Sequence, residues 1–416
     1  MHKKIWFKIH WILGITAGIV LFVVGVTGAV LSFEKEITRF INQDSFIVSV
    51  PENKTKLSTK ELLEKFQAIN PKAKINSVSI TNEPSSSVVI NVAGIGEGKE
   101  ARRGVNYYLN PYTAEILPDL KGKEFFSLML RLHRWLALEG DAREVGKQTV
   151  AISTVALIVL VISGIIVYWG RIKHSFFKSF TFKFKHKGRA FLSTMHSAIG
   201  MWVIPFYLLA ALTGLYWSYG WYNTMLYKIA GVEKPQRMMP PKEQQKVEGQ
   251  KVEQKPIAQA PRGEKPKRDI SQMGENSKIQ VQRREENSQS KFADVQKAID
   301  MFNIFIQKDY YSFIVRLPQK GTIYSFTYLD DKSDYFRHSN TLELDINSWQ
   351  LLKDDRFKEK PLNEQLMRSI LPLHTGEYFG IIGQIGMFLA SSLMALFVIT
   401  GFMLFINRHK KKKAKK

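Results

Sequence analysis

Residues 10–28, HWILGITAGIVLFVVGVTG, and residues 196–214, HSAIGMWVIPFYLLAALTG, share the spacing that decides the fold. Each stretch begins with a histidine, has a glycine four positions later and ends in Thr-Gly, so four residues coincide without a gap. Neither stretch contains a charged residue, and about 20 residues of helix cross a hydrocarbon core of ~30 Å. The match therefore predicts a duplicated membrane helix.

The rest of the chain fits this duplication. We expect four transmembrane helices, at 11–33, 148–170, 190–222 and within 371–407, the last range including a short interfacial segment. The N-terminus at 1–10, the loop at 171–189 and the tail at 408–416 are basic, which places all three in the cytoplasm by the positive-inside rule. The formal charge of +23 is concentrated beside apolar spans, so we predict a lipid bilayer as partner and no nucleic acid. The long connections then lie on the far side, in the periplasm of a bacterial inner membrane.

Both long connections have patterns typical of small α+β domains. In residues 34–125, Ser58 and Glu61 have capping-box spacing before a helix that reaches about Ile69, and strand-like stretches follow at 75–81, 87–92 and 105–109. Residues 291–370 repeat this order, with a helix at 292–306 and strands after it. Residues 126–147 form a predicted interfacial segment. Residues 233–290 are rich in Lys, Glu, Gln and Pro, and we predict that 223–290 form a polar, largely disordered linker.

Four histidines occupy repeat-related positions. His10 and His196 start the matched stretches, while His133 and His374 precede the second span of each half. Charge topology places the first two near the cytoplasmic ends of the spans and the other two near the periplasmic ends. Two facing imidazoles can hold a b-type haem, and the absence of cysteine excludes covalent c-type attachment. We therefore predict two b haems, one between His10 and His196 and the other between His133 and His374.

Simpler roles remain open for these residues. A histidine at a membrane interface can serve only as a hydrogen-bonding or snorkelling residue. Arg134, with Arg131 and Arg368, can pair with haem propionates or anchor the interface, and we assign Arg134 to the cofactor. The remaining histidines are expected in solvent: His2, His174, His186, His338 and His409. The Thr-Gly and Ser-Gly pairs are assigned to helix packing.

These motifs resemble the PepSY-associated transmembrane family, which includes iron-regulated inner-membrane proteins. The resemblance rests on the two His-x3-Gly spans with Thr-Gly, on Leu132-His133-Arg134 and Leu373-His374, and on the strand endings at 108–113 and 344–348. It implies that the two α+β domains are PepSY-like. It also implies similarity to ferric-siderophore reductases, with His10, His133, His196 and His374 as the family histidines. An unusually long linker and Ser163-Gly164 in place of Thr-Gly are departures from the pattern.

The predicted function is electron transfer across the membrane. Electrons enter from a quinol or a cytoplasmic reductase and leave to a ferric chelate or siderophore in the periplasm, a haem-dependent oxidoreductase reaction that needs no general acid or base. One alternative is a non-enzymatic membrane anchor whose PepSY-like domains bind peptides or regulate an envelope protease. A second alternative is a transporter that moves a metal or siderophore between the duplicated halves.

Overall fold

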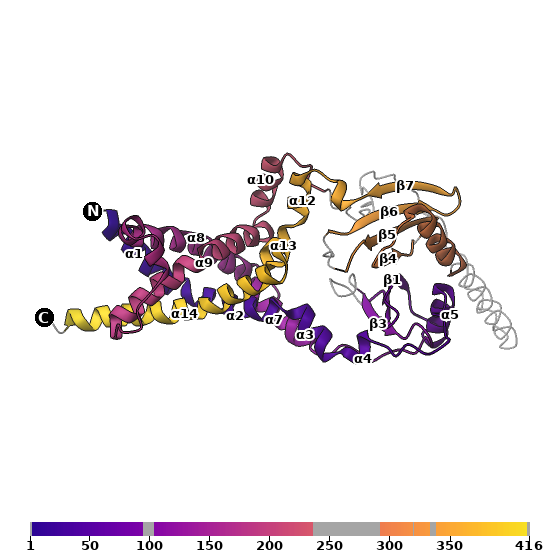
Figure 1. Ribbon diagram of the computed structural model, residues 1–416, viewed down its shortest axis with the longest axis horizontal. Coiled ribbons are helices and arrows are strands. Elements are labelled where there is room, and N and C mark those ends of the chain that lie inside the picture. The colour runs from indigo at the N-terminus through magenta and orange to yellow at the C-terminus, as the bar shows by residue number, and fades with distance from the viewer. Residues whose placement is uncertain (1, 95–103, 236–291, 319, 333–337, 414–416) are drawn as a thin grey trace, which may run out of the picture.

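The computed structural model describes residues 2–94, 104–235, 292–318, 320–332 and 338–413. Its described part consists of a helical bundle and a separate antiparallel sheet (Figure 1). The first helix of the chain begins, and the last helix ends, at the end of the bundle farthest from the sheet (Figure 1). Short helices join the two parts along two sides.

Three helices are long and apolar enough to cross a membrane: α8 (Ala142–His174), α9 (Gly188–Ser218) and a continuous stretch from 377 to 408 that contains most of α14 (Gly380–Lys413). A fourth crossing is available if α1 (His2–Thr16) and α2 (Gly18–Leu31) form one span, although they are bent by 63°. The sequence predicted one transmembrane helix at 11–33. The bend lies directly before Gly18. Because glycine is a poor helix former, the helix is interrupted at this point.

Small residues let these helices approach closely. A side-chain carbon added at Gly25 on α2 would lie 2.8 Å from Met394 Cγ and 3.0 Å from the backbone oxygen of Ser391 on α14. Tyr207 on α9 donates a hydrogen bond of 2.9 Å to the backbone oxygen of Ala390. Without a hydrophobic driving force between helices in lipid, such close contacts and hydrogen bonds hold the bundle together.

The sheet has seven strands in the order β3-β2-β1-β4-β5-β6-β7, and every neighbouring pair is antiparallel. The strands are β1 (Ile75–Thr81), β2 (Val88–Val92), β3 (Val105–Leu109), β4 (Ser312–Arg316), β5 (Ile323–Leu329), β6 (Asn340–Asp345) and β7 (Gln350–Asp355). The strands predicted at 75–81, 87–92 and 105–109 are therefore present within one residue. In β5, Tyr324, Phe326 and Tyr328 alternate with more exposed residues, so one face of the sheet is apolar.

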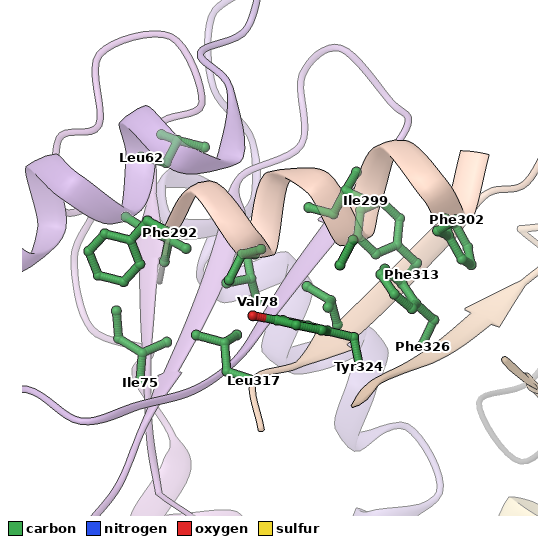
Figure 2. Packing of buried hydrophobic residues seen from close by; sticks show 14 of the residues in the cluster. Leu62, Ile75, Val78, Phe292, Ile299, Phe302, Phe313, Leu317, Tyr324 and Phe326 are labelled. Atoms are coloured by element: carbon green, nitrogen blue, oxygen red, sulfur yellow. The ribbon is translucent and has the colours of Figure 1, made fainter. Parts of the chain in front are cut away.

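Two helices cover this apolar face. One is α5 (Thr59–Ile69), which starts with the predicted capping box: Ser58 Oγ accepts from the Glu61 backbone N–H, and Glu61 accepts from the Ser58 backbone N–H. The other spans 292–306, as predicted. Figure 2 shows Phe302 of this helix beside Phe326 of the sheet, with ring centres 4.4 Å apart. Burial of these aromatic rings stabilises the sheet by removing large apolar areas from water.

The two α+β units are fused rather than separate. Strand β1 from the first unit pairs with β4 from the second, and the paired residues Val78 and Val315 are both fully buried. The expectation of two small domains is thus replaced by one continuous sheet. An edge strand of each unit exposes unpaired backbone groups, and their mutual pairing satisfies both.

Short helices connect the sheet to the bundle. On one side lie α3 (Glu34–Ile41), α4 (Gln43–Phe46) and α7 (Lys123–Trp135), and on the other lie α10 (Gly220–Ala230), α12 (Leu362–Arg368) and α13 (Ile370–Thr375), as Figure 1 shows. The predicted linker at 223–290 begins too early, since residues 223–230 belong to α10. Most of that range, 236–290, lies outside the described residues.

Candidate functional site: two histidine pairs

The four repeat-related histidines lie on four different helices. His10 is on α1 and His196 is on α9, within the bundle, whereas His133 is on α7 and His374 is on α13, at the end of the bundle nearer the sheet (Figure 1). The short helices α7 and α13 are packed against α2 and α9, respectively. Equivalent helices of the two halves therefore bring the histidines together.

The histidines form two pairs. The ring centres of His10 and His196 are 6.4 Å apart, and those of His133 and His374 are 6.2 Å apart, with ring planes nearly perpendicular in both pairs. A first-row metal ion lies about 2 Å from the imidazole nitrogen it binds, and that nitrogen is about 1 Å from the ring centre. Two imidazoles on opposite sides of one ion therefore have ring centres roughly 6 Å apart. Both pairs have the spacing of two ligands on a single ion.

Each histidine ring is held through Nδ1 by a hydroxyl on a neighbouring helix. The Nδ1 to Oγ distances are 2.9 Å for His10 to Ser163, 3.2 Å for His133 to Thr27, 2.7 Å for His196 to Thr400 and 2.9 Å for His374 to Thr213. All four hydroxyls belong to the Thr-Gly and Ser-Gly pairs that the sequence assigned to packing. The structure thus gives these pairs a second role, because they position the histidines.

Two of the contacts fix the position of the ring proton. Nδ1 of His10 lies 3.1 Å from the backbone oxygen of Leu160, and Nδ1 of His133 lies 3.0 Å from that of Val24. A carbonyl oxygen can only accept, so Nδ1 must carry the proton in both rings. The lone pair is then on Nε2, which is the nitrogen a metal ion would bind.

In three of the four hydroxyl-Gly pairs, the glycine lies against the histidine ring. A side-chain carbon at Gly28 would lie 3.1 Å from Cε1 of His133, and at Gly214 it would lie 3.3 Å from Cε1 of His374. A side-chain carbon at Gly164 would lie 3.4 Å from Cε1 of His10. The distances at Gly28 and Gly214 are shorter than ordinary van der Waals contacts, whereas that at Gly164 is at their lower limit. Gly401 differs, since nothing lies within 4 Å of the corresponding position.

A cavity of about 410 Å³ adjoins the first pair. Its walls include His10, His196 and Tyr207, together with apolar side chains of α1, α8, α9 and α14. Lys8 and Arg189 also line it, as does Arg408, whose guanidinium lies 4.6 Å from the ring centre of Phe7. These cations come from the three basic segments of the chain, none of which contains an acidic residue. The cavity can therefore attract an anionic group.

The arginines predicted at the second pair have other partners. Arg134 lies over the Trp135 ring at 5.3 Å, Arg131 forms a 3.0 Å ion pair with Glu139, and Arg368 forms one of 2.7 Å with Asp355. Arg131 retains one free hydrogen-bond donor, because its buried Nε has no hydrogen-bond partner. Arg134 remains a predicted rather than an observed cofactor residue.

Among the predicted solvent histidines whose side chains the structure describes, His338 is not simply solvated. Its ring stacks on Phe357, with centres 4.2 Å apart, and its Nε2 lies 3.0 Å from Ser369 Oγ. Ser369 is fully buried directly before α13. His338 therefore connects the sheet to the helix that carries His374.

The donor sets suit a haem better than a bare ion. Among the described residues, no group of three or more His, Cys, Asp or Glu side chains is placed to hold a metal ion. Two axial imidazoles leave the equatorial positions of an iron ion open, and a porphyrin supplies those nitrogens itself. The residues present thus fit a haem ligated by two histidines.

The bundle and its attached sheet define a multi-pass membrane protein. Residues 7–408 match the family described as the PepSY-associated TM region, so the chain belongs to this family, as the sequence predicted. A comparison with curated proteins finds no match.

Two features of the site were not recognised from the sequence. The hydroxyl role of Thr27, Ser163, Thr213 and Thr400 was missed, as were the cations Lys8, Arg189 and Arg408 at the cavity. A signal for the hydroxyls was available, because each half contains two histidines and two hydroxyl-Gly pairs in a matched order. Sequence spacing could not predict that the three cations meet at one cavity, since they belong to segments far apart in the chain.

Proposed function

We propose that the protein transfers electrons across a bacterial inner membrane, with one b-type haem between His10 and His196 and another between His133 and His374. The observation that carries this proposal is the presence of two imidazole pairs at ligand spacing, each ring held through Nδ1. A haem with two histidine ligands supplies a one-electron couple between Fe(III) and Fe(II).

In this proposal, residues of the chain orient the histidine ligands, neutralise the charge of the cofactor and exclude water from the site. The hydroxyls fix the orientation of the imidazoles, and Lys8, Arg189 and Arg408 neutralise propionate carboxylates at the first pair. Apolar residues of the bundle such as Leu21 and Val203 exclude water from the region beside His10 and His196. A low dielectric and a fixed environment reduce the reorganisation that accompanies a change of charge.

The proposed reaction reduces a ferric chelate or siderophore on the side of the sheet. Each Fe(III) takes one electron and becomes Fe(II), with no bond made to the protein and no proton moved by it. A quinol or a cytoplasmic reductase supplies the electron at the opposite side. We place both termini and the loop at 171–189 in the cytoplasm, because these segments carry the basic clusters. The sheet would then be periplasmic.

Haem counting tests the proposal directly. The full chain, purified in detergent after expression with excess haem, should give a pyridine haemochrome value near two b haems per chain. Replacing His10 or His374 with Ala should remove one haem, and replacing both should remove both. His174→Ala is the matched control, because His174 is an exposed histidine at the end of α8 and should retain two.

A second measurement addresses the substrate. Protein reduced by dithionite and freed of excess reductant should be reoxidised by a ferric hydroxamate or catecholate chelate, with one Fe(II) formed for each electron lost. A haem content near zero in the wild type would contradict the electron-transfer proposal and favour the membrane-anchored peptide-binding role. If the protein binds two haems but no ferric chelate reoxidises it, the electron-transfer proposal is retained and the acceptor must be a different molecule.

A further inference from the structure

Each of the four hydroxyls that contact the histidines already donates its proton to a backbone oxygen of its own helix. Thr27, Thr213 and Thr400 each donate to the backbone oxygen four residues earlier on their own helix, at 2.6, 2.5 and 2.7 Å. Ser163 donates to the oxygen of Leu160 at 3.1 Å. A hydroxyl has a single proton, so its remaining contact with Nδ1 must be as an acceptor.

It follows that Nδ1 donates in all four rings. For His10 and His133, the nearby carbonyls of Leu160 and Val24 require the same tautomer independently. An imidazole whose Nδ1–H is hydrogen-bonded to an acceptor becomes a more basic ligand at Nε2. A more basic axial ligand favours the higher oxidation state of the iron and lowers its reduction potential.

His196 depends on its hydroxyl more than the other three histidines do. His10 and His133 have a carbonyl as a second acceptor, and His374 has the backbone of Ala210. Within the described residues, the only hydrogen bond of His196 goes to Thr400 Oγ1, and at 2.7 Å it is the shortest of the four to a hydroxyl. No atom lies within 4 Å of a side-chain carbon added at Gly401, and a further neighbour of the ring is the apolar Phe397, edge-on with ring centres 5.0 Å apart, which offers no acceptor.

We propose that Thr400 is a positioning residue that sets the ligand strength of His196 and thereby lowers the potential of the metal site between His10 and His196. Thr27, Ser163 and Thr213 act on their histidines in the same way, with smaller individual effects because a backbone acceptor shares the proton. This inference rests on the proposed function, since it assumes that the pairs bind haem iron.

The test compares Thr400→Val with Thr400→Ser in the full haem-loaded chain. Valine keeps the shape of threonine and removes the acceptor, whereas serine keeps the hydroxyl. Spectroelectrochemical titration should show one of the two haem potentials shifted to a more positive value in Thr400→Val and unchanged in Thr400→Ser. Low-spin electron paramagnetic resonance signals of one haem should change in the valine variant alone. Ser163→Ala should give a smaller positive shift.

Thr154→Val is the matched control. Thr154 lies on α8 and donates to the backbone oxygen of Val150 at 2.8 Å, but it contacts no histidine, so both potentials should stay unchanged. Unchanged potentials and spectra in a Thr400→Val protein with two haems would overturn this inference and leave the proposed function intact. Loss of one haem in Thr400→Val but not in Thr400→Ser supports the positioning role. A wild type without haem overturns both proposals.

Discussion

At the scale of single residues, the site depends on a two-residue unit that repeats four times. The hydroxyl of the unit accepts the Nδ1 proton of a histidine, and the glycine beside it gives the ring its space. Three of the four glycines lie against Cε1 of their histidine, and Gly401 does not. This difference provides a matched pair of substitutions.

We expect Gly28→Ala to displace the His133 ring and Gly401→Ala to be tolerated. The new methyl group at Gly28 would lie 3.1 Å from Cε1 of His133 and 3.5 Å from Ser391 Oγ, so the ring must move and its contact with Thr27 must weaken. The haem content should fall from two to one in Gly28→Ala and remain at two in Gly401→Ala. Equal haem contents in the two variants would show that the glycine does not govern the approach of the ring.

At the scale of secondary-structure elements, the joint between the two halves of the sheet also has an ionic contact. Glu83 follows β1 and pairs with Lys332, which follows β5, and with Arg39 of α3 at 3.8 Å. The hydrogen bond from Lys332 holds the pKa of the Glu83 carboxyl below its usual value. Sequence patterns predicted the strands of both halves but gave no indication that this carboxylate connects them.

The lowered pKa gives the Glu83 contact a definite pH dependence. Its stabilising effect is fully present above the usual carboxyl pKa and is lost as the pH falls through the lowered value in the folded protein. Glu83→Gln should therefore reduce the melting temperature by a degree or two at pH 7, an order of magnitude typical of exposed ion pairs. The difference from wild type should shrink as the pH falls below the usual carboxyl pKa and should vanish once the pH is below the lowered pKa of Glu83 in the folded protein. A deficit that persists at low pH would mean that glutamine disturbs packing rather than charge.

At the scale of the whole molecule, the two halves are held together by contacts rather than by the chain connection. Val78 and Val315 pair at the centre of the sheet, and Gly25 of α2 lies against Met394 of α14 in the bundle. Close helix contacts in the membrane and a shared sheet outside it both resist separation.

Cutting the chain between the halves should therefore leave the complex intact. A specific protease site inserted within 236–291 and cleaved in detergent should yield two fragments that elute together in size-exclusion chromatography. A denaturing gel of the same fraction verifies that cleavage is complete. Fragments that elute separately would show that the joint sheet and the bundle are too weak to hold the halves.

The orientation of the molecule can be tested because the natural chain has no cysteine. Lys183→Cys lies in the basic loop between α8 and α9, and Lys54→Cys lies between α4 and α5 on the side of the sheet. A membrane-impermeant maleimide should label Lys54→Cys in spheroplasts and should label Lys183→Cys only after permeabilisation. The reverse pattern would invert the proposed direction of electron flow.

The sequence by itself determined the family, three apolar helices long enough to cross a membrane and most strand positions. It also predicted which histidines face each other, and the ring distances come from the structure. Apolar length, alternation and the repeated His-x3-Gly spacing are local or periodic signals, so they can be detected without coordinates. Four crossings, the haems and the sidedness remain predictions. The bend before Gly18 was missed, because several glycines lie in the apolar run at 11–33 and the sequence does not indicate which of them interrupts the helix.

Only the tertiary structure decided that β1 pairs with β4, that one sheet replaces two domains, and that Thr400 and its counterparts hold the histidines. The paired strands are more than 200 residues apart, as are His196 and Thr400. No local propensity encodes such contacts. The strand pairing arises when each half satisfies the other's unpaired backbone groups, and the ring N–H of His196 is satisfied by a hydroxyl from a distant helix of the same half.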